Sequence, residues 1–130
     1  KKGNYSEHDP VKPFNNYGLS KLGGECAVRM YENSLVLRLT MTEKPFKYKK
    51  AYSNLFTNFM FHEEVVELLP LIISQKGIIN VGGKSQSVYL FAKSYNNKIK
   101  KIKLSKKSYL PQRQTMNTIK LKKILNNKSN

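Results

Sequence analysis

The stretch NNYGLSKLGGE, residues 15–25, places a tyrosine and a lysine four positions apart, with glycines on both sides of the lysine. Either asparagine at its start can cap a helix, which we expect to run to about Glu32. At positions i and i+4 of that helix, Tyr17 and Lys21 share one face. Apolar residues at helical spacing predict an inward stripe beside that face; they are Leu19, Leu22, Cys26 and Met30.

Predicted strands and helices alternate along the rest of the chain. Strands are expected at residues 34–40, 76–83 and 101–104, and helices at 63–74, 85–95 and 117–125. Residues 42–54 are interpreted as a loop, and 55–61 are ambiguous between strand and helix. Alternation of this kind indicates an α/β fold with parallel strands. Because residues 1–14 are interpreted as a loop, the first helix has no strand before it. We therefore expect the sequence to begin partway through an α/β fold.

Two of the later helices have clear inward faces. In the helix expected over residues 63–74 the inward residues are Val65, Val66, Leu68, Leu69 and Ile72, and Pro70 is expected to disturb it. In the helix expected over residues 85–95 they are Val88, Phe91 and Ala92.

The net charge of +16 is unevenly distributed. Residues 98–130 hold ten lysines, one arginine and no acid, which accounts for eleven of the sixteen net charges. Lysine greatly outnumbers arginine, although arginine is the residue expected in a selected phosphate site. We therefore interpret the charge as compositional drift and do not expect nucleic acid as a partner.

The cysteine count, the apolar segments and the start of the sequence indicate the compartment in which the protein is expected. A single cysteine, Cys26, excludes an intrachain disulfide and favours a reducing compartment, and its position on the apolar stripe predicts a small core residue. The stretch VVELLPLII is broken by Glu67 and Pro70 and is too short to span a bilayer. KKGNYSEHDP is not a signal peptide, so we expect a cytoplasmic protein without a membrane partner.

Several motifs associated with catalysis fail on spacing. GLSKLGGE (18–25) and GIINVGGKS (77–85) both lack a lysine directly after the second glycine, which a phosphate-binding loop requires. HEEVV (62–66) has Val66 where a zinc helix needs its second histidine. With His8 and His62 as the only histidines, no metal site is expected.

Tyr17 and Lys21 remain as candidates for proton transfer. A tyrosine phenol has an ordinary pKa of about 10, and an ammonium group held close to a phenol favours the phenolate. Lysine also suits the role because its ammonium can donate hydrogen bonds to a ligand. Gly24 lies near the same face, so the missing side chain would let a ligand or a neighbouring helix approach.

The flanks of this pair resemble a known family. The turn at Glu7–Pro10, the approach Pro13–Gly18 and the helix segment Lys21–Glu25 are similar to the Tyr-x-x-x-Lys region of the extended short-chain dehydrogenase/reductases. The likeness is greatest to the dTDP-4-dehydrorhamnose reductase group of sugar-nucleotide-binding proteins.

Later segments support the resemblance, which covers most of residues 3–125. SLVLRLT (34–40) is similar to the next strand of the family, FHEEVVELLPLII (61–73) to a helix after the crossing into the substrate domain, and KGIINVGGKSQSVYLFAK (76–93) to a strand, paired glycines and a helix. Met41 departs from the family, which has an aromatic residue after the arginine-containing strand.

The resemblance implies the C-terminal portion of a Rossmann-like parallel-sheet fold with a substrate-binding lobe. Residues 1–54 would end the Rossmann-like domain, and residues 55–130 would form mostly the substrate lobe with a basic tail. The dinucleotide-binding half, with its glycine-rich turn and first strands, would lie before Lys1 and would be the partner of this chain. The oligomeric state, including a homodimer, stays open.

The resemblance also implies an activity and its residues. With NADP or NAD as cofactor, the enzyme would reduce the 4-keto group of a nucleotide-linked deoxysugar, as in dTDP-rhamnose biosynthesis. Tyr17 would protonate the oxygen, and Lys21 would hold the cofactor ribose and favour the phenolate of Tyr17, so that both residues contact the cofactor. Arg38, Thr40 and Met41 would contact the substrate at the end of their strand.

Three other classes remain open. An epimerase or dehydratase shares the Tyr–Lys pair, a non-catalytic member would use the fold to bind or regulate, and a nucleic-acid-binding module would use the lysine-rich tail.

Overall fold

The computed structural model describes residues 3–128 as a mixed α/β structure with parallel strand pairs. Strand β1 (Leu35–Leu39) pairs in parallel with β6 (Gly77–Val81), so that Leu37 lies opposite Ile79. Both strands are mostly aliphatic, as is typical of parallel strands; β6 is buried over its last three residues, while β1 is half-buried. The α/β class with parallel strands that the sequence indicated is therefore confirmed.

Shorter strand pairs follow the end of β1. They are β2 (Met41–Thr42) with β5 (Met60–Phe61) and β3 (Lys50–Tyr52) with β8 (Lys100–Ile102), both parallel, and β4 (Phe56–Thr57) with β7 (Gln86–Ser87), antiparallel. The ambiguous segment 55–61 thus contains two short strands, β4 and β5. Strand β3 lies inside the predicted loop 42–54. Three of the four strand pairs within residues 3–128 join a strand from residues 1–54 to a strand from residues 55–130. The predicted boundary between two domains at residue 54 stays a prediction about the complete protein.

Helix α1 (Asn16–Val28) begins as predicted and ends earlier than predicted. The Asn15 side chain accepts a hydrogen bond from the Gly18 amide at 2.8 Å, which caps the first turn. The expected end at Glu32 is wrong, because Met30 and Tyr31 donate to carbonyls only three residues back and close turns that lead into β1.

The remaining helices are α2 (His62–Ile72), α3 (Val88–Tyr95) and α4 (Ile119–Lys128). The inward face of α3 is confirmed, with Val88, Phe91 and Ala92 buried. Helix α2 continues through Pro70 for two residues, and of its predicted inward residues Val66 is exposed, so that prediction was wrong. Within the described residues, no helix combines the length and apolar character needed to cross a bilayer.

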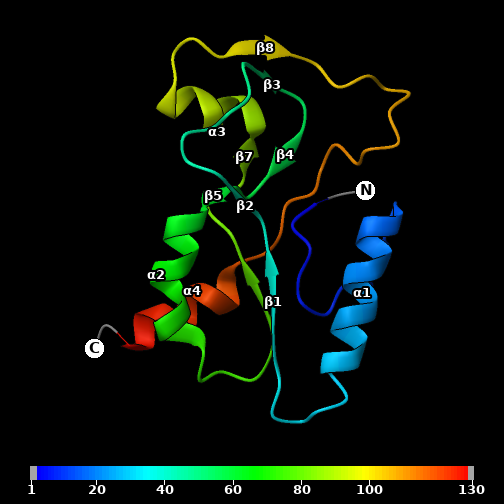
Figure 1. Cartoon of the computed structure of the whole chain (residues 1–130), viewed down its shortest axis with the longest axis vertical. Coiled ribbons are helices and arrows are strands. Elements are labelled where there is room, and N and C mark those ends of the chain that lie inside the picture. The colour runs from blue at the N-terminus through cyan, green and yellow to red at the C-terminus, as the bar shows by residue number, and fades with distance from the viewer. Residues whose placement is uncertain (1–2, 129–130) are drawn as a thin grey trace.

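Two hydrophobic clusters form the core, and they occupy different parts of the molecule (Figure 1). One surrounds α3, with Phe61 and Phe91 at its centre. The other lies where α2 and α4 cover β6, with Ile72 and Ile79 almost fully enclosed. Helix α1 stands on the other side of β1 from α2 and α4 (Figure 1).

Helix α1 has no buried residue, although its apolar stripe predicted a core face. Leu19 and Met30 are exposed, and so is Cys26, which corrects its interpretation as a small core residue. Only Leu22 of the predicted stripe is half-buried within residues 3–128, and Met30 lies in the turn after the helix, so the predicted core face was wrong.

The outer edge of β1 is open as well. The Gly77 amide donates to Ser34 and the Thr40 amide donates to Val81, so the even-numbered residues of this segment direct their peptide groups toward β6. In a parallel ladder the alternate residues, Leu35, Leu37 and Leu39, direct theirs the other way. No strand within residues 3–128 pairs with that edge.

Candidate functional site

Tyr17 and Lys21 lie side by side on the first turns of α1. The Lys21 ammonium lies 5.4 Å from the centre of the Tyr17 ring, and Tyr17 is 70% exposed. Within residues 3–128 neither the Tyr17 hydroxyl nor the Lys21 ammonium makes a hydrogen bond or an ion pair. Both groups are therefore available to a ligand that approaches this face.

The glycines of α1 have different surroundings. A Cβ on Gly18 would lie 3.2 Å from the capping oxygen of Asn15 and 3.3 Å from Pro13, so glycine fits a crowded entry to the helix. A Cβ on Gly23 or Gly24 would meet nothing within 4 Å among the described residues. The surface around the latter two glycines is open to a ligand or to another part of the protein.

An ion pair joins α1 to β1. Arg38 donates two hydrogen bonds to the Glu25 carboxylate, from Nε at 3.0 Å and from Nη2 at 2.7 Å. It also donates from Nη1 to the Glu7 carbonyl at 3.2 Å. The Glu25 side chain is only 9% exposed. The hydrogen bond from Arg38 lowers the pKa of Glu25, and the carboxylate in turn raises the pKa of Arg38.

We expect acidification to loosen α1 before the rest of the chain. Because the pKa of Glu25 is lowered in the folded state, its stabilising effect is complete above the ordinary value of 4.5 and is lost as the pH falls through the lower, folded value. The charges that face it are Arg38 and Arg29, and Glu7 lies near Arg38. Amide exchange measured against pH should show α1 losing protection below about 4.5 while β6 remains protected, and simultaneous loss in both elements would contradict this.

A first cavity, which we call the arginine cavity, has a volume of about 490 Å³. The opening loop contributes Tyr5, Ser6, Asp9, Pro10, Val11, Lys12 and Phe14 to its lining, and the rest of the chain contributes Arg38, Asn80, Pro111, Arg113, Gln114 and Met116. The sequence has only three arginines, at positions 29, 38 and 113, and two of them line this cavity. The Arg113 guanidinium lies 5.0 Å from the centre of the Phe56 ring, an arrangement that suits arginine.

Hydrogen bonds from buried Asn80 hold the walls of the arginine cavity together. The backbone amide of Asn80 donates to the Glu7 carboxylate at 3.0 Å. Its side-chain amide donates to the carbonyls of Tyr5 at 3.0 Å and Asn117 at 3.1 Å. Asp9 closes the opening turn by accepting from the Ser6 amide and hydroxyl. The opening loop and the segment before α4 are thereby fastened to β6.

The paired glycines after β6 fit a close approach between chain segments. A Cβ on Gly82 would lie 2.8 Å from the Asn58 carbonyl oxygen, and one on Gly83 would lie 2.6 Å from that of Phe59. Asn58 accepts a hydrogen bond from the Met116 amide at 2.7 Å, which links this crossing to the arginine cavity.

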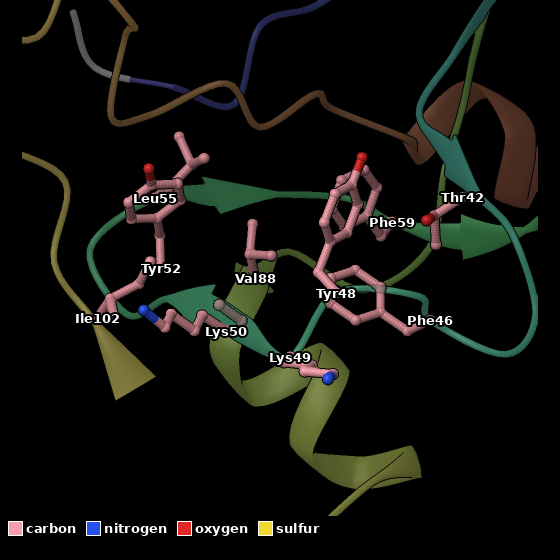
Figure 2. A pocket seen from close by; sticks show the side chains of 11 residues that line it. Thr42, Phe46, Tyr48, Lys49, Lys50, Tyr52, Leu55, Phe59, Val88 and Ile102 are labelled. Atoms are coloured by element: carbon pink, nitrogen blue, oxygen red, sulfur yellow. The ribbon is translucent and has the colours of Figure 1, made fainter. Parts of the chain in front are cut away.

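A second cavity, which we call the aromatic cavity, has a volume of about 550 Å³. Figure 2 shows Tyr48 and Phe59 toward one end of the cavity, Tyr52 and Leu55 toward the other, and Val88 between them. Its full lining is Thr42, Phe46, Tyr48, Lys49, Lys50, Ala51, Tyr52, Leu55, Phe59, Val88 and Ile102.

The predicted substrate residues lie at or beyond the end of β1. Arg38 lines the arginine cavity, Thr40 donates from its hydroxyl to the Met116 sulfur at 3.9 Å, and Met41 is exposed and pairs with Met60. Tyr17 and Lys21 line neither cavity. No group of three potential metal ligands is found within residues 3–128.

Sequence reasoning missed Arg113 and Glu25. An isolated arginine in a lysine-rich tail was a usable signal for Arg113, because the guanidinium fork can bind a phosphate or carboxylate through two hydrogen bonds. Glu25 and Arg38 are 13 residues apart on different elements, and no periodic pattern reports such a pair.

The comparisons with known proteins agree with this geometry at the level of the fold. No protein-family model and no curated protein matches the chain. Among solved structures, a hypothetical dTDP-4-dehydrorhamnose reductase from Sulfolobus tokodaii matches with a TM-score of 0.72 and 24% identity, over 95% of this chain and 53% of that one. The dTDP-4-dehydrorhamnose reductase of Bacillus anthracis, in complex with NADP, matches with a TM-score of 0.75 and 20% identity, over 97% and 54%.

A third structure, MoeE5 in complex with UDP-glucuronic acid and NAD, matches with a TM-score of 0.69 and 18% identity, over 97% of this chain and 54% of that one. The chain thus spans about half the length of the solved structures it matches. Its fold is the α/β fold of enzymes crystallised with nicotinamide cofactors. More particularly, it is the fold of about half of a dTDP-4-dehydrorhamnose reductase, as the resemblance implied.

Proposed function

We propose that the chain is the part of a nucleotide-sugar reductase that carries the Tyr–Lys pair and most of the substrate-binding lobe. The complete enzyme reduces the 4-keto group of a nucleotide-linked deoxysugar with NADPH or NADH. The observation that carries the proposal is the open Tyr17–Lys21 face, on a fold shared with about half of two dTDP-4-dehydrorhamnose reductases.

Tyr17 and Lys21 divide the proton chemistry between them. When bound, a nicotinamide cofactor would supply the hydride for the C4 carbon of the sugar. Tyr17 gives its hydroxyl proton to the carbonyl oxygen as that oxygen gains charge. Lys21 hydrogen-bonds the cofactor ribose and stabilises the phenolate that remains on Tyr17. The two unpartnered donors on one helix face fit this task.

The two cavities suit different parts of a nucleotide sugar. A guanidinium can donate two parallel hydrogen bonds to two oxygens of a phosphate group, so Arg113 binds the diphosphate in the arginine cavity. Flat rings suit the aromatic cavity, where the nucleobase packs against Tyr48 and Phe59. Arg38, Thr40 and Met41 contact the sugar at the strand end, where ligands bind in open α/β sheets.

Replacing Arg113 should weaken substrate binding more than it slows the chemistry. In the complete protein we expect Arg113→Gln to raise KM for the nucleotide sugar by about 10- to 100-fold, since hydrogen bonds to charged groups contribute about 1.5–3 kcal/mol. The kcat should stay within about threefold because Arg113 does not touch the reacting carbon. Steady-state kinetics would measure both constants, with Lys106→Gln in the same basic tail as a matched control. An unchanged KM would remove Arg113 from the site.

The uncovered surfaces support a partner that completes the fold. The open edge of β1 is apolar and carries no proline or lysine, unlike edges that proteins leave exposed. The exposed stripe of α1 is apolar as well. A strand from the dinucleotide-binding half pairs with β1, and that half covers α1 and brings the cofactor to Tyr17 and Lys21.

A second candidate is an NAD-dependent enzyme that epimerises or dehydrates a sugar nucleotide. The structural match to MoeE5, crystallised with NAD and UDP-glucuronic acid, favours keeping it. Incubation of the complete protein with NADPH and a dTDP-linked 4-keto-6-deoxysugar separates the two functions. A reductase consumes NADPH in proportion to the alcohol formed. Isomerised or dehydrated product without net consumption of NADPH would establish the second candidate instead.

A further inference from the structure

We infer that Glu25 is a positioning residue, which acts through Arg38 to hold the Tyr17–Lys21 face of α1 at a fixed place beside the end of β1. The inference rests on the proposed function for its catalytic consequence. The anchoring of α1 by this ion pair can be tested without measuring catalytic activity.

Within residues 3–128, the Glu25–Arg38 ion pair is the main polar link between helix α1 and the rest of the fold. It has no buried residue, and Leu19 on its apolar stripe is exposed. Within residues 3–128, the side-chain hydrogen bonds from Arg38 to Glu25 are the only ones that join α1 to another strand or helix. The other partner of Glu25, Arg29, lies in the turn that directly follows α1 and reaches it at 3.6 Å from an exposed position.

The ion pair between Glu25 and Arg38 restrains the orientation of α1 as well as its distance from β1. Both Glu25 oxygens accept from the Arg38 fork, and bidentate pairs of this kind add geometric specificity. Glu25 follows Lys21 by four residues and Tyr17 by eight, so the three side chains lie along neighbouring turns of one side of the helix. The third bond of Arg38, to the Glu7 carbonyl, ties the opening loop into the same junction.

Arg38 also lines the arginine cavity while it holds Glu25. Its guanidinium has five N–H donors in all, and the three hydrogen bonds to Glu25 and Glu7 leave others for a ligand. The junction therefore joins the helix that carries the proton donor to the wall of the cavity that we assign to the substrate. A shift of about 1 Å in catalytic groups can cost about 100-fold in rate, so this anchoring has a catalytic consequence.

The direct test is amide hydrogen exchange of the 130-residue chain. Glu25→Gln should speed the exchange of α1 amides at least about tenfold, with exchange in β6 and α3 unchanged. Arg29→Gln is the matched control, since it removes the exposed partner of Glu25 and leaves Arg38 in place, and it should change nothing. Unchanged protection of α1 in Glu25→Gln would overturn the inference, as would equal loss of protection in every element.

Kinetics of the complete protein test the catalytic consequence. Glu25→Gln should lower kcat by about 10- to 100-fold with KM for the nucleotide sugar within about threefold. An unchanged kcat beside a loosened α1 would overturn the positioning role. Inactivity of the unmodified protein would refute the proposed function alone, and the exchange result would still decide whether Glu25 anchors the helix.

Discussion

In the complete protein, Tyr17→Phe is expected to lower kcat by about 100- to 10,000-fold, the usual cost of losing a general acid. The substitution removes one oxygen from an exposed side chain that lies beside Lys21. The fold and its stability should therefore be unaffected. The binding constant of the cofactor should change little, because Lys21 still reaches the ribose.

Tyr31→Phe provides the matched control, since Tyr31 is an exposed tyrosine in the turn just after α1. It should leave kcat unchanged. Single-turnover measurements at saturating substrate would compare the two variants. A loss of less than about tenfold in Tyr17→Phe would mean that another group donates the proton.

The start of α1 was predictable from the sequence, while the environment of the helix was not. Asn15 before an apolar periodic stretch is a local signal, and the structure shows its side chain capping the Gly18 amide. The burial of Leu19 and Cys26 depends on what lies against the helix, and periodicity identifies an apolar face without showing whether it is covered.

The larger strands were predictable for the same local reason. Residues 35–39 and 77–81 are apolar runs between turn residues, and they form the parallel pair β1–β6. The two-residue strands at 41–42 and 60–61 are too short to carry a period, so only tertiary contacts define them.

For the candidate site, the sequence indicated single residues and missed their partners. Tyr17 and Lys21 lie together because spacing along one helix determines their geometry. Arg38 was predicted as a substrate contact, which stays a prediction, but its bonds to Glu25 and Glu7 join segments 13 and 31 residues away. Such links depend on the packing of α1 and the opening loop against β1.

The central proposal is that this chain contributes one half of a reductase. We expect the 130-residue chain alone to oxidise no NADPH above the buffer blank when a dTDP-linked 4-keto-6-deoxysugar is present. It contributes the Tyr–Lys face and both cavities, but neither of its glycine-rich stretches, 18–25 and 77–85, has the G-x-G-x-x-G spacing of a dinucleotide-binding turn. In the proposed enzyme, the backbone amides that hold the dinucleotide would come from the complementary half.

The decisive measurement follows NADPH oxidation while the chain is titrated with a polypeptide that carries the dinucleotide-binding half of the fold. Activity should appear only in the mixture, saturate at equal amounts of the two parts, and be lost when the chain carries Tyr17→Phe. Steady NADPH oxidation by the chain alone would contradict the account. So would a complete protein that binds the cofactor and the nucleotide sugar together and never reduces the sugar.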